Sequence, residues 1–255
     1  MYLFERVHFL LDFSLGVALV FEHVQDMGSV MKTTSKNSGE KTRAAIFETA
    51  LDLFRDRGFE VTTMRDIAKA AKVATGAAYY YFASKEAIVA AYYEQVQRLH
   101  EEKVRDQLKG KSGLRERLGV VLHSKLEILK EDRKFLGALF RYTGEADHPL
   151  SVFGKGSAGQ RAQSLALWRE AISEAGLSED LRRLLPPVLW LAHLGMILAL
   201  IYDASENQKK THELVDNVLD LFTQIVAWTN SAFIRPFVQP WQSKVLEMLQ
   251  EAGWA

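Results

Sequence analysis

The stretch Thr63–Phe82 (TMRDIAKAAKVATGAAYYYF) predicts two short helices joined by a tight turn at Lys72-Val73. Two helices cross steeply over such a turn only where a small residue lets them approach, and Ala68 is that residue. Apolar side chains must fill the angle between the helices, and four are available: Ile67, Ala71, Val73 and Ala78. This pattern is typical of a helix-turn-helix, whose second helix enters the major groove of DNA.

Three consecutive tyrosines, Tyr79, Tyr80 and Tyr81, close the second helix. Neighbours on a helix point about 100° apart, so the three side chains cannot all face a core. We therefore expect at least one hydroxyl to reach solvent or a DNA phosphate. Lys85, beside Ser84 at the start of a longer helix, would bring a cation and backbone N–H groups to a phosphate.

The flanking residues extend this pattern on both sides. In order, the matching positions are Thr42-Arg43, Ile46, Ala50, Phe54, Gly58-Phe59, Thr62-Thr63, Ile67-Ala68, Val73, Gly76, Tyr79, Phe82 and Ser84-Lys85-Glu86. Over residues 40–90 the chain thereby resembles the DNA-binding domain of the tetracycline-repressor (TetR) family. The resemblance implies an all-α fold, with a three-helix DNA-binding head and its helix-turn-helix on a larger helical body. In that family the body dimerises and usually binds a small effector.

The resemblance also implies which residues contact DNA. They are Thr63, Thr75, Gly76, Ala77, Tyr79, Tyr80, Tyr81 and Lys85. Two positions depart from the family's pattern. The turn usually has glycine where this chain has Lys72, and a left-handed lysine there costs about 1 kcal/mol. The reading helix is usually capped by serine where Ala74 stands, and a lost cap also costs about 1 kcal/mol.

Composition narrows the function classes. The 255 residues contain 32 basic and 32 acidic side chains, so any basic surface for DNA must be local. The absence of cysteine excludes disulfides, thiolate nucleophiles and Cys-ligated zinc, and it fits a cytoplasmic protein. No nucleophile elbow, zinc-protease or dinucleotide-binding motif stands in a credible context, so we expect no enzyme, no cofactor and no metal. His123 and Glu127 have metal-like spacing, but further ligands are missing and a surface pair is expected.

The chain divides into three expected parts. Residues 1–39 are an apolar extension and a flexible basic arm, and alternative starts at Met27 and Met31 leave open whether residues 1–30 belong to the native protein. Residues 40–98 form the expected head, and residues 99–255 form the expected dimerisation and effector-binding body. Helical periodicity predicts body helices at about 84–108, 113–130, 132–142, 160–175, 179–204 and 208–233, followed by a short amphipathic helix after Pro240. Asp132 is the expected cap of the helix that it opens.

One segment could suggest a membrane. Leu184–Tyr202 carries no charge over 19 residues, which is close to the length of a membrane span. It contains Pro186, Pro187 and His193, and no second span accompanies it. We therefore predict a helix buried on all sides, and no membrane partner.

The helix at 208–233 carries two interleaved apolar series, which make a stripe wider than one core contact needs. We expect one edge to pack internally and the other to face a partner chain. The part of the preceding helix after its two prolines, residues 188–202, contains Gly195, which permits close approach of another helix. Two copies of each of these two helices could therefore form a four-helix bundle. The expected homodimer interface is Gly195, Leu214, Val218, Leu221, Ile225 and Trp228. A large monomeric core is the alternative.

Aromatic residues suggest an effector pocket in the body. The candidates are Phe135, Phe140, Trp168, Trp190, His193 and Tyr202, with a small apolar effector as the expected ligand. Each aromatic residue could equally be plain core. His193 must find a polar partner if it is buried, and a satisfied core histidine is the favoured interpretation.

Together these features predict a sequence-specific regulator that binds a double-stranded DNA operator as a homodimer, most simply a ligand-responsive repressor. An activator, or a regulator that needs no effector, would have the same head. A helical enzyme or carrier that keeps the head as a scaffold is a further alternative. The operator, the effector and the regulated genes are not specified by the sequence.

Overall fold

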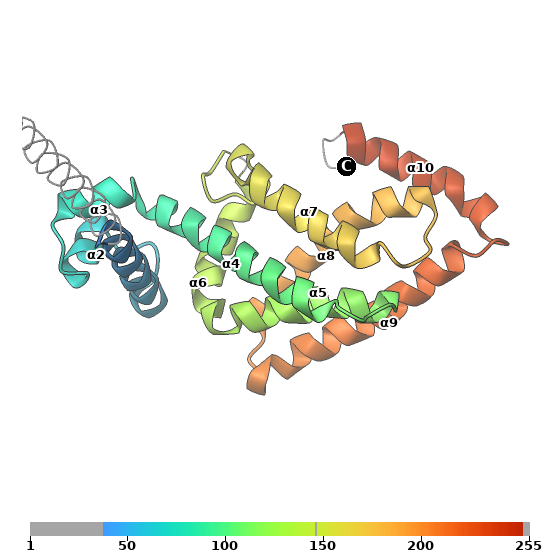
Figure 1. Ribbon diagram of the computed structural model, residues 1–255, viewed down its shortest axis with the longest axis horizontal. Helices are drawn as coiled ribbons and strands as arrows, with labels where there is room; N and C mark the ends of the chain where they lie inside the picture. The colour runs from blue at the N-terminus through green and yellow to red at the C-terminus, as the bar shows by residue number, and fades with distance from the viewer. Residues whose placement is uncertain (1–37, 146, 252–255) are drawn as a thin grey trace, which may run out of the picture. The chain divides into compact units, whose positions relative to one another are not determined.

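The computed structural model describes residues 38–145 and 147–251, which Figure 1 shows as helices joined by turns and loops. These described residues contain no strand, which confirms the all-α prediction. The predicted apolar extension, with Met27 and Met31, and nearly all of the basic arm lie outside the described residues.

Contacts divide the chain into two compact units. Of the described residues, the smaller unit contains those up to Asp52 together with Met64–Tyr81, and the larger unit contains Leu53–Thr63 and those from Phe82 onward. Residues 38–57 form one helix that contributes to both units. The boundary near residue 98 that the sequence suggests falls inside a continuous helix, α4 (Lys85–Gln107).

In the smaller unit, α2 (Met64–Ala70) and α3 (Thr75–Tyr81) pack against each other. Ile67, Ala68 and Ala78 are at most 1 % exposed, so the small residue and two of the apolar residues expected at the crossing are buried. This arrangement confirms the predicted helix-turn-helix.

The turn between α2 and α3 keeps its left-handed residue. Lys72 has φ 57°, although it is not a glycine. The Val73 N–H closes the turn by donating to the Ala68 carbonyl at 3.0 Å. α3 then begins on Ala74, whose backbone carbonyl accepts from Ala77 N–H at 2.9 Å, and which has no side-chain oxygen to cap the helix. Both predicted departures from an ideal turn are therefore present.

The larger unit is built mainly from seven described helices. They are α4, α5 (Leu114–Leu129), α6 (Arg133–Phe140), α7 (Ala158–Ile172), α8 (Glu179–Tyr202), α9 (Lys209–Thr229) and α10 (Arg235–Glu251). α5 packs against α4, α7 and α9, and α8 packs against α6, α7 and α10 (Figure 1). Ser84 starts α4 as predicted, because its hydroxyl accepts from the Ala87 N–H at 3.2 Å.

Asp132 precedes α6 as predicted, but its predicted capping role is wrong. Its carboxylate makes no cap bond; it accepts from Arg55 Nε at 2.6 Å and from the Tyr92 hydroxyl at 2.8 Å. Burial raises the pKa of Tyr92, and the charge of Asp132 raises it further. The carboxylate serves a buried network that joins three separate segments of the larger unit, because a guanidinium is a stronger donor than a helix N–H.

A second buried carboxylate orders the connection from α8 to α9. Asp203 accepts four hydrogen bonds, from the backbone N–H and hydroxyl of Ser205 and of Thr211, at 2.6 to 2.8 Å. Burial by itself would raise the pKa of Asp203, but these hydrogen bonds outweigh it and hold the pKa well below its usual range.

Two predictions about the apolar helices are wrong. α8 is not buried on all sides, since Leu191, Gly195 and Leu198 share one exposed face. By length and composition it is the one described helix that could cross a membrane, a test that core helices also pass. α10 begins at Arg235 and continues through Pro240, and its packing against α8 offsets the cost of a proline inside a helix.

Candidate functional site

The exposed face of α3 carries most of the predicted DNA contacts. Tyr80 is 82 % exposed and Tyr79 is 52 % exposed, which confirms that the three tyrosines do not all face a core. The remaining positions divide by exposure: Thr63, Thr75 and Gly76 are exposed, and Ala77 and Tyr81 are half-buried. The helix TGAAYYY has no charged side chain. A helix with this surface can approach DNA closely and offer hydroxyl groups to it.

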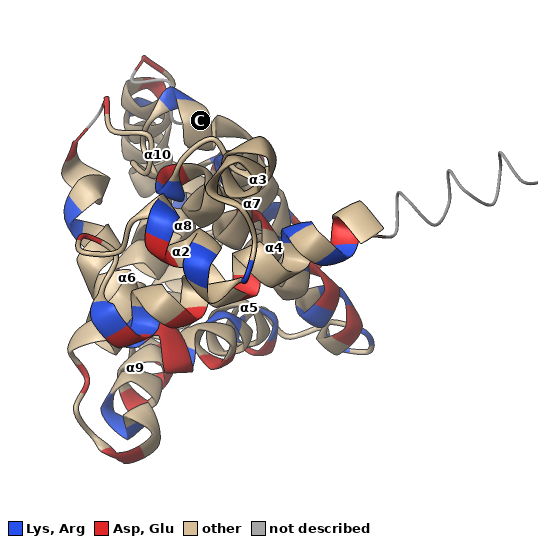
Figure 2. Cartoon of the chain, turned by 90° about the vertical axis from the view of Figure 1, so that its left-hand side faces the viewer, with Lys and Arg blue, Asp and Glu red and all other residues tan. Residues whose placement is uncertain are grey.

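Basic side chains stand next to this face along the chain. Arg65 and Lys69 lie on α2, which carries blue segments in Figure 2, and both side chains are exposed. Lys72 in the turn is exposed as well. The cations of the helix-turn-helix thus precede α3 in the chain, and contacts from such cations to phosphate would position the protein on DNA without selecting a sequence.

Lys85 has partners within the protein. Its ammonium donates to the backbone carbonyls of Phe59 at 2.8 Å and Glu60 at 3.1 Å, and it lies 4.3 Å above the Phe59 ring. In this structure the side chain therefore stabilises the segment that follows the first helix. Contact of Lys85 with a phosphate stays a prediction.

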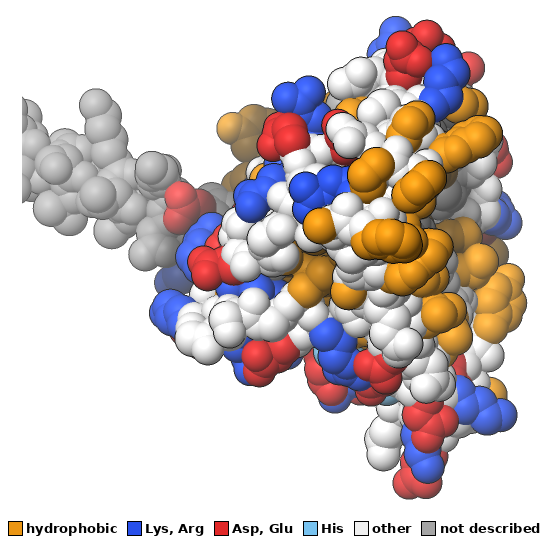
Figure 3. Space-filling view, turned by 90° about the vertical axis from the view of Figure 1, so that its right-hand side faces the viewer, with side chains coloured by type: hydrophobic (Ala, Val, Ile, Leu, Met, Phe, Trp, Pro, Cys, Tyr) orange, Lys and Arg blue, Asp and Glu red, His pale blue; other side chains and the backbone are white. Residues whose placement is uncertain are grey.

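The larger unit exposes an apolar surface. Figure 3 shows hydrophobic side chains gathered on one face of the molecule. On α9, Leu221 is 60 % exposed and Trp228 is 59 % exposed, and Leu214 and Ile225 are exposed too. Val218 is half-buried, and Gly195 on α8 is exposed with open space where a Cβ would stand. The opposite edge of α9 is buried through Val215, Leu219 and Val226, which confirms that one edge of the stripe packs internally.

The larger unit also holds a cavity of about 170 Å³. Three of the six predicted pocket residues line it: Phe140, Trp190 and His193. Phe135 instead stacks on Phe54 and packs edge-on against Tyr92 in the core. Trp168 is fully buried without lining the cavity, and Tyr202 is 80 % exposed at the end of α8.

His193 contradicts the expectation of a satisfied core histidine. It is 4 % exposed, and neither ring nitrogen has a hydrogen-bond partner among the described residues. Burial, together with the smaller effect of the nearby charge of Lys125, lowers the pKa of His193 to about 3. The imidazole is therefore neutral at physiological pH and leaves one donor and one acceptor unused.

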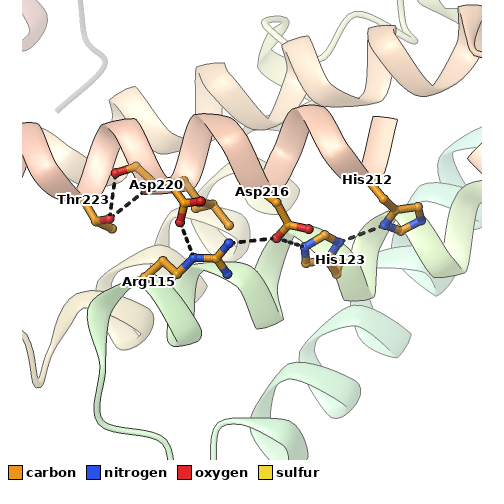
Figure 4. A network of polar contacts seen from close by, with 7 residues as sticks. Arg115, His123, His212, Asp216, Asp220 and Thr223 are labelled. Carbon is orange, nitrogen blue, oxygen red and sulfur yellow. Dashed lines mark hydrogen bonds and ion pairs between the residues drawn. The ribbon is translucent and has the colours of Figure 1, made fainter. Parts of the chain in front are cut away.

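The predicted pairing of His123 with Glu127 is wrong. His123 reaches across from α5 to α9, where it lies 2.9 Å from His212 and 3.2 Å from Asp216, as Figure 4 shows. Glu127 pairs with Lys130 at 3.1 Å. Arg115 completes the α5–α9 network with bonds to two aspartates of α9. Among the residues described, no group of three or more His, Cys, Asp or Glu side chains is arranged to hold a metal ion.

Comparison with known proteins identifies the family. Residues 46–92 match the family model for "Bacterial regulatory proteins, tetR family", and residues 117–239 match the model for "Tetracyclin repressor-like, C-terminal domain". The chain belongs to the TetR family. The two matched regions cover the helix-turn-helix and most of the larger unit.

Curated relatives of this TetR-family chain match it over the DNA-binding region. The transcriptional repressor KstR2 of Rhodococcus jostii is 45 % identical over 56 residues, which are 22 % of this chain and 26 % of the relative. The transcriptional regulator TtgR of Pseudomonas putida is 37 % identical over 71 residues, or 28 % of this chain and 34 % of the relative. The chain thus matches about a quarter to a third of these relatives' length.

Solved structures share the fold over most of the TetR-family chain. A putative TetR-family regulator from Syntrophomonas wolfei has a TM-score of 0.58 at 18 % identity, over 72 % of this chain and 95 % of that one. The fatty acid degradation regulator FadR from Bacillus halodurans has a TM-score of 0.54 at 19 % identity, over 70 % and 94 %. AibR, in complex with isovaleryl coenzyme A and operator DNA, has a TM-score of 0.51 at 22 % identity, over 69 % of this chain and 97 % of that one. At these identities the likeness shows the fold.

Sequence reasoning missed two sets of residues in this TetR-family protein. Lys125 lines the cavity from α5, and its spacing of four from both Val121 and Leu129 places it on their buried face. This helical spacing would have predicted that Lys125 is a cation at a core position. The second set is a stripe of exposed apolar side chains along α10, which starts just before the helix. Its residues are spaced by four and then three positions: Phe233, Phe237, Trp241, Val245 and Met248. Its periodicity was visible in the sequence.

Proposed function

We propose that this TetR-family chain is a sequence-specific DNA-binding transcriptional regulator, which acts as a homodimeric, effector-released repressor in the cytoplasm and has no enzymatic activity. The proposal rests on the position and the exposed surface of α3. α3 is the second helix of a helix-turn-helix, it lies within the region that matches the family model, and it exposes small residues and two tyrosines.

DNA contact is proposed at Thr63, Thr75, Gly76, Ala77, Tyr79, Tyr80, Tyr81 and Lys85. Because α3 carries no charge, its contacts with DNA are hydroxyl and backbone contacts, while phosphate charge is met by the exposed cations Lys69 and Lys72. Each phosphate that a cation neutralises adds about 0.9 to the slope of log affinity against log salt concentration. Few cations at the site imply a shallow salt dependence.

The homodimer is proposed to form through the exposed faces of α8 and α9 in a four-helix bundle, with Gly195, Leu214, Val218, Leu221, Ile225 and Trp228 at the interface. Side chains as large as Trp228 are seldom left this exposed next to other apolar residues unless a partner covers them. The exposed stripe of α10 would widen the same interface. Two heads would then read half-sites about 34–36 Å apart.

The cavity is proposed as the effector site. α4 forms part of its wall through Tyr93 and Gln97, and only three residues separate the start of this helix from the end of α3 at Tyr81. A ligand that favours one position of α4 would shift the population of head orientations, and so the fit of two heads to one operator. AibR binds both isovaleryl coenzyme A and operator DNA, which supports the presence of an effector site and a DNA site in one chain of this fold.

Selection from a random double-stranded DNA library tests the proposal, using the full chain at about 150 mM salt. We expect a palindrome with half-sites one helical turn apart. Tyr80→Ala should weaken binding to it by roughly 5- to 150-fold, the effect of losing a specific contact of about 1–3 kcal/mol. The matched control is Leu99→Ala, which truncates an exposed side chain outside every proposed site and should change nothing. Failure to enrich any sequence would contradict the proposal.

A further inference from the structure

The cavity contains a buried cation without a counter-ion. Lys125 is 5 % exposed, and its single hydrogen bond runs to the Gln97 side-chain oxygen at the long distance of 3.5 Å. No carboxylate of the described residues forms an ion pair with it, because Gln97 stands between Lys125 and Glu101 and donates to Glu101 at 3.0 Å. A charge buried in this way destabilises the fold unless an opposite charge pairs with it.

Unused hydrogen-bonding groups lie on the same side of the cavity. His193 lines the cavity with both ring nitrogens unpartnered. Behind it, Trp168 and His100 each keep a buried nitrogen without a partner among the described residues, and their rings lie 5.9 and 6.1 Å from the His193 ring. The free His100 Nδ1 is an acceptor, because the Nε2 of this ring donates to the Val121 carbonyl. Buried donors are nearly always satisfied in folded proteins, so the unpartnered donors of His193 and Trp168 indicate that an acceptor belongs there.

The remainder of the wall is largely apolar. Leu129, Leu136, Leu139, Phe140 and Ile197 come from α5, α6 and α8. A cavity of about 170 Å³ corresponds to roughly ten water-sized positions, so it suits a ligand of about ten non-hydrogen atoms. The site therefore has one end that favours an anion and a larger part that favours hydrocarbon.

We propose that this cavity binds a small organic acid, whose carboxylate lies between Lys125 and His193 and whose apolar tail extends along Leu129, Leu136 and Ile197. The proposal rests on the effector site proposed above and names its ligand class. A neutral alcohol of the same size would leave the ammonium unpaired, and an amine would be repelled by it.

Proton linkage gives the proposal a second signature. Burial lowers the pKa of Lys125 to about 7, against the attraction of Glu101, which raises it. A bound carboxylate favours the ammonium, so binding above pH 7 takes up one proton. Affinity should therefore fall as pH rises, by about 30-fold between pH 6 and pH 8.5. The other ionisable groups around the ammonium are few: Tyr92, Tyr93, His100 and Glu101 on α4, Arg161 on α7 and His193 on α8.

Calorimetry with octanoate, octan-1-ol and octylamine tests the ligand class on the full chain. At pH 6.5 we expect octanoate to bind at least tenfold more tightly than octan-1-ol, and octylamine not to bind. Lys125→Met keeps the length of the side chain and removes its charge. It should bring octanoate down to the affinity of octan-1-ol and raise the melting temperature, because a buried unpaired charge is removed. The matched control, Lys103→Met, removes a nearby charge that does not line the cavity and should keep the preference.

Four results would overturn the proposal. They are equal affinity for octanoate and octan-1-ol, a preference that survives Lys125→Met, a Lys125→Met protein that is less stable than the wild type, and no binding of any carboxylate from butanoate to decanoate. Operator binding is measured separately on the same protein. A chain that binds octanoate but selects no DNA sequence contradicts the proposed function, while a chain that selects an operator but prefers no acid contradicts the ligand class alone.

Discussion

Replacing Lys72 by glycine should stabilise the helix-turn-helix and weaken its hold on DNA at the same time. A non-glycine residue in the left-handed region, where Lys72 has φ 57°, costs about 1–2 kcal/mol. Glycine removes that strain but gives the unfolded chain more conformational freedom, which reduces the gain in stability by about 0.5–1 kcal/mol. The net gain is about 0.5–1 kcal/mol.

Hydrogen exchange measures this gain within the smaller unit. The amides of Val73, Ala77 and Ala78 donate within the turn and the first turn of α3, so their protection reports local opening. A gain of about 0.5–1 kcal/mol raises their protection about two- to fivefold. Lys72→Ala keeps the left-handed strain while removing the charge, so it should leave protection near the wild-type level.

DNA titrations separate the two effects. Both Lys72→Gly and Lys72→Ala remove one exposed cation, so each should lower the salt slope of operator binding by about 0.9. Lower protection in Lys72→Gly than in the wild type would refute the strain argument. An unchanged salt slope in both variants would show that Lys72 does not contact phosphate.

Three further predictions concern the larger unit. Asp203→Ala should cost about 3 kcal/mol in urea denaturation at pH 7, since it breaks four hydrogen bonds to a carboxylate. Because the folded pKa of Asp203 is lowered, the wild-type advantage should be full above pH 4 and shrink as the pH falls below it; a constant difference down to pH 3 would count against this. Arg115→Ala should cost at most about 1 kcal/mol, because its ion pairs are about half exposed, and a larger loss would show that the network of Figure 4 fixes α5 on α9. Trp228→Glu should convert a dimer into a monomer in light scattering with little change in melting temperature, while Leu99→Glu should not; a Trp228→Glu dimer would exclude this face as the interface.

The features that sequence predicted correctly depend on short-range spacing. The burial of Ile67 and Ala78, the left-handed Lys72 and the exposure of Tyr80 all follow from residues within one or two helical turns. The alternation of buried and exposed edges on α9 follows from helical periodicity alone.

The features that sequence reasoning missed depend on partners far along the chain. Asp132 was an obvious local cap, yet its carboxylate bonds to Arg55, 77 residues away. His123 finds His212, 89 residues away, instead of Glu127 within its own helix. The isolation of Lys125 is likewise a tertiary property, because only the packing of α4 against α5 shows that no carboxylate of the described residues reaches it.

The central claim is that α3 reads a specific DNA sequence, and a competition titration tests it most directly. The selected palindrome and a scrambled duplex of equal length and composition would be titrated with the full chain at about 150 mM salt. We predict that the palindrome binds at least about a thousandfold more tightly, the lower range for specific DNA-binding proteins. Equal binding of the two duplexes would contradict the account.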